Sequence, residues 1–307
     1  MAKYFLGLDA GSTLCKAAVF DRAGRQFSEA KRRTPMSRPH AGWCELDPEI
    51  CWHAVLEVIS EAVDTCGIPP AEIGGIGISA AMVGAWVVDA AGNALRPGIN
   101  WEDSRSQTIL NRMIAADPAV MSKIFRSSGS VLQQGCTLPV LAWLVENEPE
   151  VMARAAHVLS YKDFIRLKLT GLAATDRSEA SVIPGSARQR QRSAEMITLF
   201  GLDDHARLLP PVFDSETTQS GLTADAAAMT GLAEGLPVAI GAGDVAATVI
   251  GAGGLAAGVA TAVLGTPCMV GICHDRPVFT PPDLGLLFSL PGDVWYRSMV
   301  NVAGTLN

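Results

Sequence analysis

The sequence predicts an α/β fold with a mixed sheet flanked by helices. Strands come first along the chain. The apolar segments Lys3–Leu8 and Leu14–Phe20 are joined by a short turn, and a third strand, Arg25–Arg33, follows a second turn. Helices and strands then alternate, from a helix over 48–66 to a buried strand over 237–241. This order is typical of an α/β domain whose sheet mixes parallel and antiparallel pairs.

Start and stop signals define the individual elements. Asp47 is a typical N-cap, Pro48 is suited to the first helical position, Glu49 is an acid in the first turn, and Gly67 ends the helix. The other predicted helices are Ser104–Ala116, Leu138–Asn147, Pro149–Ala155, Tyr161–Leu169 and Thr223–Met229, and the other predicted strands are Ile73–Ser79, Ala85–Asp89, Pro237–Gly241, Val259–Leu264 and Cys268–Ile272. The segment Arg177–Gly221 is polar and irregular, which predicts an excursion over the surface.

Composition excludes several classes of partner. A net charge of −7 argues against a nucleic-acid partner. The basic segments Lys31–Arg33 and Arg188–Arg192 contain no aromatic residues, and we expect both on the solvated surface. Seven cysteines without CxxC spacing indicate reduced thiols and a cytoplasmic location. The five histidines form no zinc-binding pattern.

The uncharged run Val245–Cys273 is long enough to span a bilayer. It contains six glycines and Pro267 but few large aliphatic residues, which favours helix, turn and strand inside a core. The N-terminal apolar run stops at Asp9, so it is not a signal peptide. We therefore expect no membrane partner.

Two unequal parts are predicted, a first domain over residues 1–236 and the beginning of a second over 237–307. The second part holds about seventy residues, at the low end for a domain that folds alone. The last residues, Asn301–Asn307, resemble neither a closing helix nor a closing strand, and we expect the chain to be truncated there.

Asp9 stands at the end of the first strand, beside the turn formed by Gly11, Ser12 and Thr13. Such a turn can bind phosphate oxygens through N–H groups and hydroxyls, and the carboxylate can hold Mg²⁺ through water. An ordinary hairpin turn is the alternative interpretation.

Six segments in this order resemble the FGGY family of sugar kinases, whose fold is the ribonuclease-H-like fold shared with actin. They are Leu8–Asp21, Gly42–Trp52, Ile76–Gly92, Ile99–Arg105, Leu169–Ser181, and Gly241–Asp244 with Leu264–Thr266. No GxxxxGK[ST] P-loop and no protein-kinase motif set is present. The resemblance implies two domains of this fold, the second one incomplete here.

The resemblance implies an ATP- and Mg²⁺-dependent kinase for the terminal hydroxyl of a ketopentose or similar polyol. Asp244, in a glycine turn after a buried strand, is the expected general base; the alternative role is an N-cap of the following helix. Asp9 is the expected Mg²⁺ ligand. The phosphate-binding residues implied are Gly11, Ser12, Thr13 and Lys16 from the first domain, with Gly265 and Thr266 from the second. Lys16 could equally be an edge-strand lysine, and Gly265–Thr266 a simple hairpin.

The sugar pocket implied by the resemblance contains Met82, Val83, Trp101 and Asp103, with Arg105 as support. Trp101 offers an apolar wall to the carbon face of a sugar, and the Asp103 carboxylate can accept hydroxyl hydrogen bonds. A core tryptophan with a surface salt bridge is the competing interpretation.

Departures from the family pattern limit the substrate assignment. Many members carry Gln and His, or Arg and Glu, where this chain has Ala80–Val83. Val245 follows the expected base, and with Ile78–Ala80 it is closer to the L-xylulose kinase branch. Arg177 replaces a frequent tyrosine and Pro267 a frequent serine or threonine, so we expect the nearby loops to differ in shape.

Two other functions are alternatives to the kinase. Gly241-x-Gly243-x-x-Ala246 is similar to a dinucleotide-binding fingerprint, but no acid follows about twenty residues later, where such sites contact the ribose. The other alternative is a catalytically incomplete sugar-binding fragment, because the family's adenine-binding segments should lie beyond residue 307. The sequence does not determine the oligomeric state and leaves a homodimer open.

Overall fold

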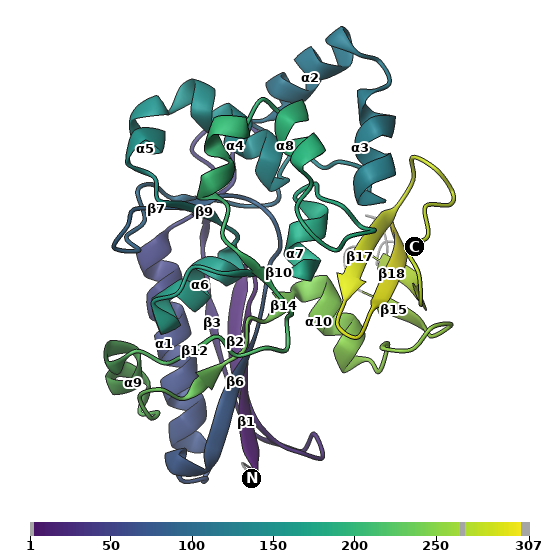
Figure 1. The fold of residues 1–307 in the computed structure, drawn as a ribbon. Coiled ribbons are helices and arrows are strands. Elements are labelled where there is room, and N and C mark those ends of the chain that lie inside the picture. The colour runs from purple at the N-terminus through teal and green to yellow at the C-terminus, as the bar shows by residue number, and fades with distance from the viewer. Residues whose placement is uncertain (1–2, 265–267, 302–307) are drawn as a thin grey trace.

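The computed structural model describes residues 3–264 and 268–301. Its largest sheet among these residues has seven strands in the order β12-β13-β6-β1-β2-β3, with β14 also paired to β6 (Figure 1). The strands are β1 (Tyr4–Ala10), β2 (Leu14–Asp21), β3 (Gln26–Arg33), β6 (Ile73–Ala80), β12 (Ser220–Gly221), β13 (Pro237–Val238) and β14 (Ala242–Gly243). β1 is antiparallel to β2 but parallel to β6, which confirms the predicted mixed sheet.

The long helix α1 (Pro48–Thr65) covers one face of this sheet and packs against β2 and β3. The Asp47 carboxylate accepts the N–H groups of Glu49 and Ile50, at 2.9 and 3.0 Å. The buried face of α1 includes Val55 and Ile59, which belong to the main core. The predicted helix start is therefore confirmed, and capping explains why it begins there.

A second hydrophobic core lies among the helices drawn in the upper part of Figure 1. It is formed largely by α2 (Gln107–Ala116), α3 (Val120–Ser128), α4 (Thr137–Asn147), α5 (Pro149–Arg154) and α8 (Ala194–Leu199). The other described elements are β4 (Met36–Ser37), β5 (Glu45–Leu46), η1 (Pro70–Glu72), β7 (Trp86–Val88), β8 (Gly98–Ile99), β9 (His157–Leu159), α6 (Tyr161–Thr170), β10 (Thr175–Asp176), α7 (Arg177–Val182), η2 (Asp203–Leu208), β11 (Val212–Phe213), α9 (Ala224–Thr230) and α10 (Asp244–Gly251). α6 packs against the main core, where Trp86 stacks on Tyr161.

The prediction that 177–221 is an irregular surface excursion is wrong. This segment contains α7, α8 and η2, and Ser178, Glu179 and Ser181 are buried. Each of these three side chains makes a hydrogen bond inside the protein, which makes its burial tolerable. The expectation that residues 188–192 lie on the solvated surface is also wrong at Arg190, because this residue is buried and pairs with Asp293.

The second sheet is antiparallel, in the order β15-β16-β18-β17. Its strands are β15 (Ala260–Leu264), β16 (Cys268–His274), β17 (Leu286–Leu290) and β18 (Val294–Asn301). Figure 1 shows it in yellow and yellow-green, and β17 packs against α7 and α10. β13 and β14 still belong to the first sheet although they follow residue 236, where a domain boundary is predicted.

Among the described residues, no helix combines the length and apolar character needed to cross a bilayer. The uncharged run 245–273 includes α10, β15 and β16 instead.

Candidate active site

Three parallel strand ends place the predicted Mg²⁺ ligand, Asp9, and the predicted general base, Asp244, at the same edge of the sheet. Asp9 on β1 is paired with Ser79 on β6, and Ser79 is paired with Ala242 on β14. Asp244 comes two residues after Ala242, at the start of α10. Ser79 Oγ donates to Asp9 Oδ1 at 3.3 Å. The sheet thus holds two carboxylates from distant parts of the chain at one edge, where ligands bind in open α/β sheets.

Asp244 is partly buried and is the first residue of α10, with Gly243 at the N-cap position. The alternative role of Asp244 as N-cap therefore does not apply. Its Oδ1 accepts the N–H of Val245 at 2.8 Å. Burial, with a smaller contribution from the negative charge of Asp9, raises the pKa of Asp244 to about 6. A carboxylate with this pKa is mostly ionised at pH 7 and is still a useful base.

Lys16 on β2 lies opposite Asp9 on β1, with Nζ 3.6 Å from Asp9 Oδ2. Both side chains are about 40% exposed, so each can also reach a ligand. β2 lies between β1 and β3, so Lys16 is not an edge-strand lysine. Asp9 and Lys16 line a cleft of about 660 Å³ that extends to Ala247 and Ile250 of α10.

The turn after Asp9 is held in a compact shape. The Gly11 N–H donates to the Leu14 carbonyl at 3.1 Å, and a Cβ at Gly11 would lie 2.8 Å from that oxygen. Thr34 Oγ1 donates to the carbonyls of Gly11 and Ser12, and its N–H donates to Thr13. Glycine is therefore required at position 11 for steric reasons. The predicted phosphate residues Gly265 and Thr266 lie outside the described residues.

Trp101 is 44% exposed, which rules out the competing interpretation of a core tryptophan. Its Nε1–H donates to Ser12 Oγ at 3.2 Å, so the predicted sugar wall adjoins the phosphate turn. Met82 and Val83 are each 8% exposed and belong to a hydrophobic cluster with α10. A Cβ at Gly243 would come within 2.3 Å of Met82 Cγ, so Met82 packs directly on the turn that carries Asp244.

Asp103 and Arg105 form a buried ion pair. Asp103 is fully buried, and its oxygens accept from the Cys44 N–H at 2.6 Å and from Arg105. Arg105 also pairs with Glu45 at 2.7 Å and lies 3.7 Å above the ring of Trp43. The prediction that the Asp103 carboxylate faces a sugar is wrong because protein donors occupy it, and the alternative of a surface salt bridge is wrong because the pair is buried. Both residues support the loop that presents Trp101.

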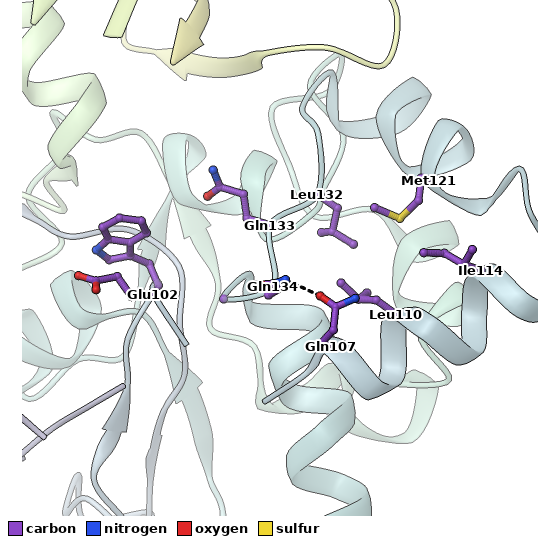
Figure 2. A pocket seen from close by; sticks show the side chains of 10 residues that line it. Glu102, Gln107, Leu110, Ile114, Met121, Leu132, Gln133 and Gln134 are labelled. Atoms are coloured by element: carbon purple, nitrogen blue, oxygen red, sulfur yellow. Dashed lines mark hydrogen bonds between the residues drawn. The ribbon is translucent and has the colours of Figure 1, made fainter. Parts of the chain in front are cut away.

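A second cavity, of about 510 Å³, is lined by Trp101, Gln107, Leu110, Gln133 and Gln134, among others. Figure 2 shows Gln134 bonded to Gln107, and Gln133 on the same segment as Gln134. Gln133 and Gln134, which line this cavity, are not among the site residues predicted from the sequence. Their only signal was a pair of amides directly before Gly135, a residue at which a Cβ would lie 1.9 Å from the Trp101 carbonyl.

Comparison with known proteins gives a consistent result. The model for the N-terminal domain of the FGGY family of carbohydrate kinases matches residues 4–251. A probable L-xylulose kinase of Pasteurella multocida is 32% identical over 266 residues, which cover 86% of this chain and 54% of that protein. An erythritol kinase of Brucella abortus is 32% identical over 278 residues, covering 86% of this chain and 49% of that protein.

Among solved structures, the xylulose kinase from Rhodospirillum rubrum superposes with a TM-score of 0.89 at 26% identity. The match covers 98% of this chain and 61% of that structure. The predicted fold class is thereby confirmed. The chain spans about half the length of the curated relatives that it matches.

Proposed function

Because the chain belongs to the FGGY family of carbohydrate kinases, we propose that it takes part in ATP-dependent phosphorylation of a terminal hydroxyl on a ketopentose or similar polyol. The observation that carries the proposal is the meeting of Asp9 and Asp244 at strand ends on either side of β6. If both carboxylates serve one site, a phosphate tail and an alcohol can meet at that edge.

Asp244 is the proposed general base. It accepts the proton of the sugar hydroxyl while the hydroxyl oxygen attacks the γ-phosphate, and the bond from phosphorus to the leaving ADP oxygen breaks. Its pKa of about 6 suits this role, since the ionised form predominates at neutral pH. Replacing Asp244 with asparagine removes the base without changing the shape of the side chain.

Asp9 is the proposed Mg²⁺ ligand. Its half-exposed carboxylate is a hard oxygen donor at the mouth of the cleft, which fits this ion. No group of three or more His, Cys, Asp or Glu residues that could hold a metal was found within 3–264 and 268–301. This agrees with Mg²⁺ bound by one or two carboxylates together with phosphate oxygens, where it would neutralise charge on the phosphates.

Phosphate binding is assigned to the Gly11–Thr13 turn and to Lys16, with Gly265 and Thr266 as proposed additional contacts. Lys16 is held beside Asp9 and faces the same cleft, so its charge can reach phosphate oxygens. The sugar is placed against Trp101, Met82 and Val83. Trp101 supplies exposed apolar surface, while Met82 and Val83, each 8% exposed, supply little surface and no side-chain donor, so we expect modest discrimination among related sugars.

A panel of L-xylulose, D-xylulose and erythritol tests the proposal, since the matched relatives are described as kinases for such compounds. The assay measures ADP release in the presence of MgATP, and calorimetry measures binding of each compound. We expect at least one compound to bind and to be phosphorylated. If none of the three compounds binds and none is phosphorylated, the proposal is contradicted.

Sugar binding without turnover is the second candidate, because the chain spans about half the length of its curated relatives. The same panel separates the two, since this candidate predicts calorimetric binding with no ADP release.

A cytoplasmic location is also proposed, supported by the six buried free cysteines among the described residues.

A further inference from the structure

The short helix α7 touches both loops of the proposed site. Glu179 Oε1 accepts the N–H of Val83 at 2.6 Å. One residue earlier, Ser178 Oγ accepts the N–H of Gly243 at 3.0 Å. Figure 1 shows α7 near β14 and α10, and α7 packs against β14. Two neighbouring buried side chains therefore bond to the sugar-facing loop and to the turn that carries Asp244.

Val83 is held in an unfavourable backbone conformation. Its φ is +56°, in the left-handed region that β-branched residues rarely adopt. Such a conformation is unfavourable and persists only where surrounding contacts fix it. The bond to Glu179 is one such contact, and the bond from the Gly84 N–H to the Gly135 carbonyl, at 2.9 Å, is another.

α7 itself is firmly anchored. Asp176 Oδ2 accepts the N–H of Ser178 at 2.9 Å and the hydroxyl of Ser215 at 2.7 Å. Asp176 Oδ1 lies 3.3 Å from Nζ of the fully buried Lys162, which also donates to the Ile240 carbonyl. The start of the helix is thus tied to α6 and to the strand segment that leads to Asp244, so Glu179 projects from a fixed base.

We propose that Glu179 is a positioning residue that holds the loop Met82–Gly84 against the Gly243–Asp244 turn and thereby sets the affinity for the sugar. The inference rests on the proposed kinase function, because it requires that both loops act on one substrate. Glu179 touches no substrate itself and acts through the Val83 backbone.

The surroundings of Glu179 indicate which replacement is conservative. The residue is 3% exposed, and burial raises its pKa well above the usual range, which favours the protonated carboxyl. Its Oε2 has no partner among the described residues and adjoins a cavity of about 20 Å³ also lined by Thr137 and Thr175. Glutamine keeps an acceptor oxygen for the Val83 N–H and nearly the same size, and it carries no charge.

The test compares sugar affinities of the full chain by calorimetry, with L-xylulose, D-xylulose and erythritol as probes. Glu179→Ala leaves the Val83 N–H without its partner, and we expect the dissociation constant to rise about tenfold to a hundredfold. Glu179→Gln should restore it to within about threefold of the unmodified protein. Ser181→Ala is the matched control, because Ser181 is buried on the same helix and its hydroxyl donates to the Ser178 carbonyl, within α7 itself.

A double-mutant cycle separates positioning from general destabilisation. In Val83→Gly the left-handed φ carries no penalty, so adding Glu179→Ala should weaken sugar binding less than it does beside valine. Equal losses in the two backgrounds, or an E179A affinity equal to that of S181A, would overturn the positioning role alone. Failure of the unmodified protein to bind any probe would overturn the proposed function.

Discussion

Asp9 and Asp244 stand at the ends of two strands that both pair with β6, and the charge of Asp9 helps to raise the pKa of Asp244. Two carboxylates that act on one site repel each other, and a proton or a cation bound there relieves that repulsion. The same arrangement that raises the pKa of Asp244 is the basis for placing the proposed Mg²⁺ ion and substrate hydroxyl at this edge of the sheet.

Asp244→Asn should abolish phosphoryl transfer, leave sugar binding within about threefold, and stabilise the fold at neutral pH. The pKa of Asp244 is about 6 in the folded protein, whereas an aspartate without interactions, as in the unfolded chain, has a pKa of 3.8. The folded state therefore binds this proton more tightly. Stability therefore falls as pH rises from about 4 to about 6, by up to about 3 kcal/mol. Urea unfolding at pH 4 and pH 7 checks the sign: the variant should gain stability at pH 7 and little at pH 4.

Asp9→Asn should lower the pKa of Asp244, because it removes a negative charge but leaves burial unchanged. The pKa should settle between 3.8 and 6, as measured by NMR titration of the Asp244 carboxyl carbon. Asp21→Asn is the control, since Asp21 lies at the opposite end of the β1–β2 pair, beside Tyr4. A titration curve identical in all three proteins would refute the coupling.

Lys16→Met should weaken MgATP binding by roughly fivefold, equivalent to ~1 kcal/mol for an exposed ion pair, and leave sugar binding unchanged. Lys31→Met is a close control, because Lys31 is the cross-strand neighbour of Lys16 on β3 but pairs with Glu29. Nucleotide titration by calorimetry at low salt gives the comparison. An equal loss of affinity in both variants would show that Lys16 acts only through net charge.

Asp103→Ala should lower the free energy of unfolding by about 3–5 kcal/mol, because it leaves the buried guanidinium of Arg105 with Glu45 as its remaining carboxylate partner. Glu146→Ala breaks the exposed pair with Arg112 and should cost less than about 1 kcal/mol. Thermal or chemical unfolding measures both. Comparable losses would mean that the burial of Asp103 adds nothing to the strength of its pair.

Local signals in the sequence were enough to predict the scaffold. Asp47 and Pro48 specified the start of α1, and the turn after Asp9 specified the first hairpin, because capping and turn chemistry depend on neighbouring residues. That Asp9 and Asp244 belong to one site is predicted only through the family resemblance. The register of β6 between β1 and β14 provides its physical basis.

The positions that sequence analysis misjudged are those whose partners are distant along the chain. Glu179 bonds to Val83, 96 residues away, and Asp103 bonds to Cys44, 59 residues away. A polar residue with such a partner has the same local sequence as one on the surface. Its burial depends on tertiary hydrogen bonds that no local pattern reveals.

The hydrogen bond from Trp101 to Ser12 joins a residue of the proposed sugar wall to a residue of the proposed phosphate turn. Occupancy of either half changes the energetic cost of occupying the other if a ligand recruits the serine hydroxyl or displaces the indole ring. Thermodynamic reciprocity then requires that nucleotide alter sugar affinity by the same factor as sugar alters nucleotide affinity. A single bond of this kind limits its own contribution to that cooperativity to about 1 kcal/mol.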